Sequence, residues 1–169
     1  MRFADITKYT RQGNWECEYS IKSFVETIED WEKNNALILN PDFQRGNVWV
    51  EEQQIKFVEF ILRGGSTAKV VYLNQAGWMN SFEGEFVCVD GLQRITALQR
   101  FMHNEIPVFG GYYKDYTDNI RTIDGMKINV NNLKTRKEVL QWYIEFNSGG
   151  TVHTDAEIQR VKKLLEECE

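Results

Sequence analysis

Apolar residues along the chain recur with two periods, and each period predicts one kind of element. Apolar positions three and four residues apart indicate one face of a helix, whereas a short apolar run favours a buried strand. The predicted helices cover residues 20–32, 51–63 and 91–103, and the predicted strands cover residues 37–39, 69–73 and 86–89. Mixed helices and strands in this order predict an α+β domain, with a small mixed sheet packed by amphipathic helices.

The last third of the chain gives a weaker pattern. Residues 105–135 combine glycine and asparagine pairs with tyrosines, and we expect short strands joined by turns there. The apolar run at 136–146 fits either a helix or a strand, with helix favoured. Thr154 and Glu157 have the spacing of a capping box, which predicts a final helix that ends near Glu167.

Length and composition favour one globular domain. The chain has 169 residues, of which 42% are apolar, so it can bury a core without disulfide bridges or structural metal ions. Residues 1–19 are polar with scattered aromatic residues, which predicts an irregular arm or a short edge strand, and residues 20–169 are expected to form the domain. The start lacks the apolar core of a signal peptide and no segment is long enough to span a membrane, so we expect a cytoplasmic protein.

Charge and metal-binding residues narrow the choice of partners. A formal net charge of −5 disfavours attraction of nucleic acid by bulk electrostatics, although a local basic groove stays open. Cys17, Cys88 and Cys168 are widely separated, which suits a reducing compartment. His103 and His153 have no other metal-ligand residues at suitable spacing, so no zinc site is expected.

The segment from Asp90 to Arg94 follows a predicted strand and begins a predicted helix. Asp90 is a typical N-cap residue, and Gly91 allows a tight turn or close approach of a ligand. Free amides in the first turn and the helix dipole favour an anion there, for example a phosphate. The alternative is a simple ion pair of Asp90 with Arg94, worth about 0.3–0.5 kcal/mol on a helix surface.

Two further segments carry polar residues in loops. Gln44 and Arg45 lie between Pro41 and Gly46 in a loop with aromatic residues on both sides. The segment 147–151 has paired glycines before the last predicted helix, which suits backbone approach to an anion. Each segment alone is a weak signal.

Together, the three segments resemble the N-terminal nucleotide-binding domain of GmrSD-type restriction systems, in the ParB/sulfiredoxin-like superfamily. The matching residues are Phe43-Gln44-Arg45 with Trp49, Asp90-Gly91-Leu92-Gln93-Arg94, and Phe146-Asn147-Ser148-Gly149-Gly150-Thr151. The resemblance implies a ParB/sulfiredoxin-like fold over about residues 20–167 and a site for a nucleoside triphosphate. Leu92 departs from the family pattern, which has a glutamine there.

The resemblance implies a role for each matching residue. Asp90, Gln93 and Arg94 would be catalytic, with Asp90 also a candidate ligand for Mg²⁺. The remaining candidates would bind the nucleotide or its phosphates, and they are Gln44, Arg45, Gly91, Asn147, Gly149, Gly150 and Thr151. Purely structural alternatives stay open. Asp90 only caps its helix, Gln93 only bridges backbone groups by hydrogen bonds, and Arg45 only pairs with Asp42 or Glu51.

The leading hypothesis is therefore a nucleoside-triphosphate-binding domain, with or without slow hydrolysis, that acts in DNA restriction, phage defence or counter-defence. Restriction members carry a separate HNH-type nuclease domain, and with only two histidines here we do not expect this chain to cut DNA by that route. One alternative is a catalytically inactive module that binds DNA or, more in keeping with the charge, a protein. Another is a ParB-like nuclease or phosphotransferase.

Overall fold

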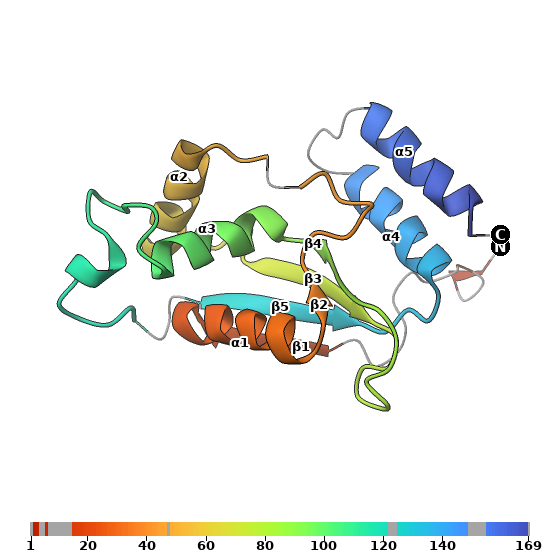
Figure 1. Ribbon diagram of the computed structural model, residues 1–169, viewed down its shortest axis with the longest axis horizontal. Helices are drawn as coiled ribbons and strands as arrows, with labels where there is room; N and C mark the ends of the chain where they lie inside the picture. Colours follow the sequence, from red (N-terminus) through yellow and green to blue (C-terminus); the bar gives the residue numbers. More distant parts are fainter. Residues whose placement is uncertain are drawn as a thin grey trace.

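The computed structural model describes residues 2–3, 6, 15–46, 48–121, 125–148 and 155–168. The elements are β1 (Trp15–Ser20), α1 (Ile21–Asn34), β2 (Leu37–Ile38), α2 (Glu51–Leu62), β3 (Val70–Gln75), β4 (Phe86–Asp90), α3 (Leu92–Met102), the 3₁₀ turn η2 (Tyr113–Asp115), β5 (Gly125–Asn131), α4 (Arg136–Ser148) and α5 (Asp155–Glu166). Figure 1 shows how they are arranged around one sheet. The predicted α+β class is confirmed.

The sheet has five strands in the order β1-β5-β3-β4-β2. β1 pairs antiparallel with β5, β5 parallel with β3, β3 antiparallel with β4, and β4 parallel with β2. The sheet is therefore mixed, as predicted. β1 forms one edge of the sheet. The last residues of the predicted arm therefore form a short edge strand, which was one of the two alternatives that the sequence left open.

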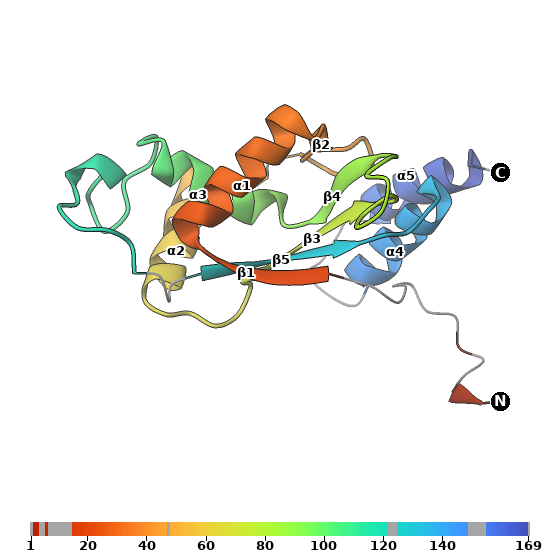
Figure 2. The same cartoon turned by 90° about the horizontal axis from the view of Figure 1, so that it is seen from below.

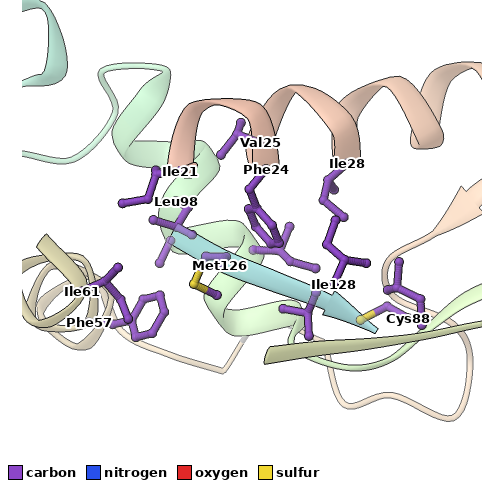
Figure 3. Close-up of a cluster of buried hydrophobic side chains, with 14 of the residues drawn as sticks. Ile21, Phe24, Val25, Ile28, Phe57, Ile61, Cys88, Leu98, Met126 and Ile128 are labelled. Carbon is purple, nitrogen blue, oxygen red and sulfur yellow. The ribbon is translucent and has the colours of Figure 1, made fainter. Parts of the chain in front are cut away.

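One face of the sheet carries the larger apolar core. α1, α2 and α3 cover it, and Figure 3 shows their side chains meeting those of β4 and β5. The labelled side chains in that view are Ile21, Phe24, Val25, Ile28, Phe57, Ile61, Cys88, Leu98, Met126 and Ile128. Each of these helices contributes buried residues at three- and four-residue spacing, so the helices predicted from the apolar pattern are confirmed.

The other face carries a smaller core. Along β4, Phe86 and Cys88 point to the first core, whereas Val87 and Val89 point to the second, where they meet α4. In Figure 2, α1 lies above the sheet and part of α4 lies below it. α4 confirms the preference for a helix at 136–146, and α5 confirms the final helix, although Thr154 lies outside the described residues.

Two local features close the larger core. Ser20 is the N-cap of α1, and its hydroxyl accepts a hydrogen bond from the Ser23 amide. The rings of Trp15, Trp31 and Trp78 lie 5.4 to 6.4 Å apart, centroid to centroid, and join β1, α1 and the turn after β3. This aromatic contact fastens the edge strand to the helix that follows it.

The expectation for residues 105–135 needs correction. Gly125–Asn131 is a seven-residue strand, β5, that lies inside the sheet between β1 and β3. It is not one of several short strands joined by turns. Its central position matters for the site, because one of its faces is polar. Among the described helices, none has the length and apolar character that crossing a membrane requires.

Candidate functional site

The turn between β4 and α3 places Asp90 and Arg94 side by side. Asp90 is the last residue of β4, and its Oδ2 accepts a hydrogen bond from Nη2 of Arg94 in the first turn of α3. The side chains of Asp90 and Arg94 are 31% and 15% exposed, so the pair is more shielded than a typical surface ion pair. The ion-pair alternative is therefore part of the structure.

The prediction that Asp90 caps the helix is wrong. Gly91 occupies the N-cap position, with a φ of 126°, and has no side chain that could cap the helix. An aspartate in that left-handed conformation would be strained, so the turn reserves the position for glycine. The start of α3 consequently keeps uncapped amides beside the Asp90–Arg94 pair.

Gly91 is also required by packing within the sheet. A Cβ atom on this residue would lie 2.6 Å from Cγ1 of Val71 on β3. A neighbouring strand therefore fills the space beside Gly91, and the predicted contact of Gly91 with a nucleotide stays a prediction. Gly91 shapes the turn from the side of the first core.

Gln44 attaches the loop between β2 and α2 to the end of β4. Its Nε2 donates to the carbonyl oxygens of Cys88 and Val89, both at 3.0 Å. From the other side, Nη2 of Arg160 on α5 donates to the carbonyl oxygens of Phe43 and Gln44, at 3.2 and 2.6 Å. The loop is therefore held between β4 and α5.

Gln93 fastens the same loop to the start of α3. Its Oε1 accepts from the amides of Val48 and Trp49, at 3.0 and 2.9 Å, and its Nε2 donates to the carbonyl oxygen of Gly46, at 2.7 Å. These contacts match the backbone-bridging alternative. We call residues 43–49, except residue 47, which is not described, the clamped loop. The predicted catalytic role of Gln93 stays a prediction.

Arg45 lies in the clamped loop between these two attachments and is half-buried. Its two proposed carboxylate partners are each bound by another arginine. Arg136 donates to both oxygens of Asp42, at 2.5 and 2.7 Å, and Arg100 contacts Glu51 at 3.0 Å. Asp42 also raises the pKa of Arg136. The structure brings the loop that carries Arg45 against the junction that carries Asp90, as the sequence predicted.

The third predicted segment is only partly described. Asn147 is near the end of α4, where its Nδ2 donates to the carbonyl oxygen of Tyr143 at 2.8 Å. The Tyr143 ring lies 5.1 Å from that of Phe43, so this end of α4 contacts the clamped loop. Gly149, Gly150 and Thr151 lie outside the described residues, and their role in closing the site stays a prediction.

Asp90 fits Mg²⁺ only in one way. In the described part of the chain, no three His, Cys, Asp or Glu residues are grouped to hold a metal ion. Proteins often hold Mg²⁺ with one or two carboxylates together with phosphate oxygens of a ligand. Asp90 therefore fits a metal ion that arrives with a polyphosphate, and it does not fit a site built from protein ligands alone.

Sequence reasoning missed two polar residues near the junction, Tyr72 and Asn129. Tyr72 lies opposite Asp90 in the β3–β4 pairing, and Asn129 lies opposite Tyr72 in the β3–β5 pairing. Burial, and after it the charges of Glu16 and Asp90, raises the pKa of Tyr72, whereas Arg94 lowers it. Alternation along β5 was the signal that could have found Asn129.

The fold and the site together define the class of protein. It is a mixed α+β domain in which the clamped loop lies over the uncapped start of α3. Residues 21–124 match the family described as GmrSD restriction endonuclease, N-terminal domain. The chain belongs to this family, which connects it with restriction systems and confirms the resemblance found in the sequence. The match includes the clamped loop and the Asp90–Arg94 junction but ends before β5 and α4. No curated protein and no solved structure gave a match.

Proposed function

We propose that the start of α3 and the clamped loop bind the phosphates of a nucleoside triphosphate. The observation that carries this proposal is the uncapped first turn of α3, which holds Arg94 and lies beneath a loop fixed by Gln93. Helix amides and the positive end of the helix dipole favour an anion at such a place. Arg94 and Arg45 add forked donors that suit phosphate oxygens.

A comparison of helix starts within the chain supports an anionic ligand. At the start of α2 the N-cap residue Val50 has no capping side chain, but Gln53 accepts a hydrogen bond from its amide, and Glu51 and Glu52 in the first turn complement the dipole. The first turn of α3 has no acidic residue and instead holds the cation Arg94. Asp90 balances part of this charge through its ion pair with Arg94, and a bound phosphate would add negative charge at a helix start whose dipole favours it.

In this proposal, each residue has a distinct task. Arg94 and Arg45 contact phosphate oxygens, and Asp90 orients Arg94 and meets Mg²⁺ or an attacking water if the triphosphate is hydrolysed slowly. Gln44 and Gln93 position the clamped loop. The segment 147–151 closes the other side. The proposal includes a ParB/sulfiredoxin-like fold and a cytoplasmic role in restriction, phage defence or counter-defence.

Calorimetric titration of the folded protein with ATP, GTP, CTP and UTP, with and without Mg²⁺, tests the proposal. We expect one or more of them to bind, and we expect Arg94→Ala to lower the affinity by roughly tenfold or more, since it removes a charge-assisted contact. Arg100→Ala is the matched control, because Arg100 lies at the far end of the same helix. Absence of binding at millimolar nucleotide would overturn the proposal, and so would an Arg94→Ala variant that binds as tightly as the wild type.

The charge of the chain favours a protein as the macromolecular partner. A net charge of −5 weakens non-specific contacts with the DNA backbone. We therefore expect weak DNA binding with a shallow dependence on salt concentration. A steep decline of DNA affinity with salt would favour DNA as the partner instead.

A further inference from the structure

Four polar residues form a row across four neighbouring strands. In the pairing registers, Glu16 on β1 lies opposite Asn129 on β5, Asn129 lies opposite Tyr72 on β3, and Tyr72 lies opposite Asp90 on β4. Directly opposite residues share a face of a regular sheet. The β3–β4 register shifts between Tyr72 and Leu73, and this irregularity places Asp90 opposite Tyr72 although Cys88 faces the first core. The row therefore begins at the edge strand and ends at the proposed phosphate site.

The row lies on the face of the sheet that α4 covers only in part. Along β5, Met126, Ile128 and Val130 enter the larger core, so Lys127 and Asn129 point to the opposite face. Trp142 of α4 forms a wall beside the row, with its ring 6.2 Å from that of Tyr72. The second face is thus apolar along β4 and polar along β5 and β1.

Asn129 supplies the strongest sign that this row has a ligand. The residue is only 7% exposed, and its Nδ2 contacts Oε2 of Glu16 at 3.4 Å. Its Oδ1 is buried and has no hydrogen-bond partner within the described part of the chain. Most buried polar atoms in proteins are hydrogen-bonded, because leaving one without a partner is costly. An acceptor is therefore held ready in the middle of the row.

The groups at the two ends of the row act on its centre. Glu16 and Asp90 both raise the pKa of Tyr72, after the larger effect of burial, so the Tyr72 phenol lies within electrostatic reach of both carboxylates. Lys127 contacts Oε1 of Glu16 at 3.4 Å and fixes the position of that carboxylate. Asn129 is hydrogen-bonded to Glu16, and Tyr72 responds to the charges of both Glu16 and Asp90.

We propose that Glu16, Asn129 and Tyr72 bind the nucleoside part of the nucleotide whose phosphates lie at Asp90 and Arg94. This inference rests on the proposed function and extends it from phosphate binding to selectivity. From β4 to β1 the row crosses three strand spacings of about 4.8 Å each, a span that suits an extended nucleoside triphosphate. The edge position of β1 leaves Glu16 accessible, with 46% of its side chain exposed.

The chemistry of the row selects a donor-rich group. The Glu16 carboxylate and the Asn129 Oδ1 are both acceptors, so they match two adjacent N–H or O–H donors. Two parts of a nucleotide have this pattern: the N1–H and exocyclic amine of guanine, and the vicinal hydroxyls of ribose. Sites built to accept hydrogen bonds discriminate strongly against ligands that lack the donors, because the buried acceptor is then left without a partner.

Calorimetric titration with GTP, ITP, dGTP, ATP and inorganic tripolyphosphate separates these sources. If guanine is the donor group, GTP binds more tightly than ITP and ATP, and dGTP resembles GTP. If ribose is the donor group, GTP, ITP and ATP bind alike and dGTP binds more weakly. In both cases Glu16→Gln is expected to weaken the preferred nucleotide by roughly tenfold while leaving tripolyphosphate affinity unchanged.

Glu18→Gln is the matched control, since Glu18 lies on the same strand and face but opposite Lys127. It is expected to change neither affinity. Equal binding of all the nucleotides with no effect of Glu16→Gln would overturn this inference and leave phosphate binding intact. An equal loss of tripolyphosphate and nucleotide in Glu16→Gln would also overturn it, because the residue would then act on the whole site. If no phosphate ligand binds the wild type, both proposals fail.

Discussion

The two faces of the sheet are held in different ways. The first face buries side chains from α1, α2 and α3 in one continuous apolar core. The second face has a smaller apolar cluster along β4, and the loop and helices around it are fastened by the side chains of Gln44, Gln93, Arg136 and Arg160. The proposed binding residues lie at the border of this second face.

This difference separates stability from positioning. Apolar burial is strong and non-directional, so it stabilises the first face without fixing any particular loop geometry. Hydrogen bonds to backbone atoms are weaker in net energy but directional, so they determine where the clamped loop lies relative to α3. The proposed phosphate site would need the second kind of contact, because phosphate ligands have to be positioned precisely.

Truncation of one leucine in each core compares how much the two cores contribute to the stability of the fold. Leu98 and Leu140 are both fully buried, in the first and second core respectively. We expect Leu98→Ala to lower the free energy of unfolding by about 4–5 kcal/mol and Leu140→Ala by about 2–3 kcal/mol, since α4 covers the sheet only in part and can move into the cavity. Urea unfolding measures both. Equal losses would break the comparison.

Replacement of Gly91, which lies against Val71 at the start of α3, is expected to have the next largest effect. Gly91→Ala combines a strained positive φ with a Cβ contact to Val71, and the expected loss of unfolding free energy is about 2–4 kcal/mol. Gly110→Ala is the control, because Gly110 also has a positive φ but has open space around it. We expect only about 1–2 kcal/mol there. Similar values for the two variants would show that the contact with Val71 relaxes easily.

The directional contacts of the second face are tested at Gln93. Gln93→Ala removes the acceptor for the amides of Val48 and Trp49 and the donor to Gly46, with an expected loss of about 1–3 kcal/mol. Hydrogen exchange at the Trp49 amide should become faster. Gln99→Ala on the same helix removes only an exposed contact and should cost less than about 0.5 kcal/mol. Unchanged exchange at Trp49 would mean that other contacts hold the loop.

The smallest expected effect concerns Tyr72 and high pH. Burial, together with Glu16 and Asp90, raises the pKa of Tyr72 above its ordinary value of 10.0, so the folded state holds the phenolic proton more tightly than the unfolded state. The stability advantage of the wild type over Tyr72→Phe is therefore complete below pH 10 and declines as the pH rises through the raised pKa. Denaturant unfolding of both proteins from pH 8 to 11 measures this difference.

A second variant tests how much of the raised pKa of Tyr72 is caused by the charge of Glu16. Glu16→Gln removes one of the negative charges that act on Tyr72, so the pKa of this tyrosine should move toward its ordinary value. Ultraviolet absorbance of ionised tyrosine follows the change. A pH-independent difference between wild type and Tyr72→Phe would separate Tyr72 from the polar row.

Sequence periodicity predicted the elements of the first face because each of them buries one regular stripe. α1, α2, α3, β3 and β4 all follow from the spacing of apolar residues. β5 was missed, although Met126, Ile128 and Val130 alternate with polar residues in it. Its asparagines have low strand propensity, and its place between β1 and β3 depends on long-range pairing that local patterns do not encode.

The candidate site was predictable in its order but not in its roles. The sequence indicated that Gln44 and Arg45 meet the segment from Asp90 to Arg94, and the structure brings these segments together. Asp90 was wrongly assigned as the cap because the turn needs glycine at that position. A glutamine amide both donates and accepts, so the sequence could not show that Gln44 and Gln93 bind backbone.

The contact of Trp15 with Trp31 and Trp78 has an optical consequence. Indole rings whose centroids lie 5.4 to 6.4 Å apart exchange excitation energy efficiently. Detachment of β1 would separate one chromophore from the other two and change the emission of the whole group. The chain thus contains an intrinsic fluorescent reporter for the strand that carries Glu16.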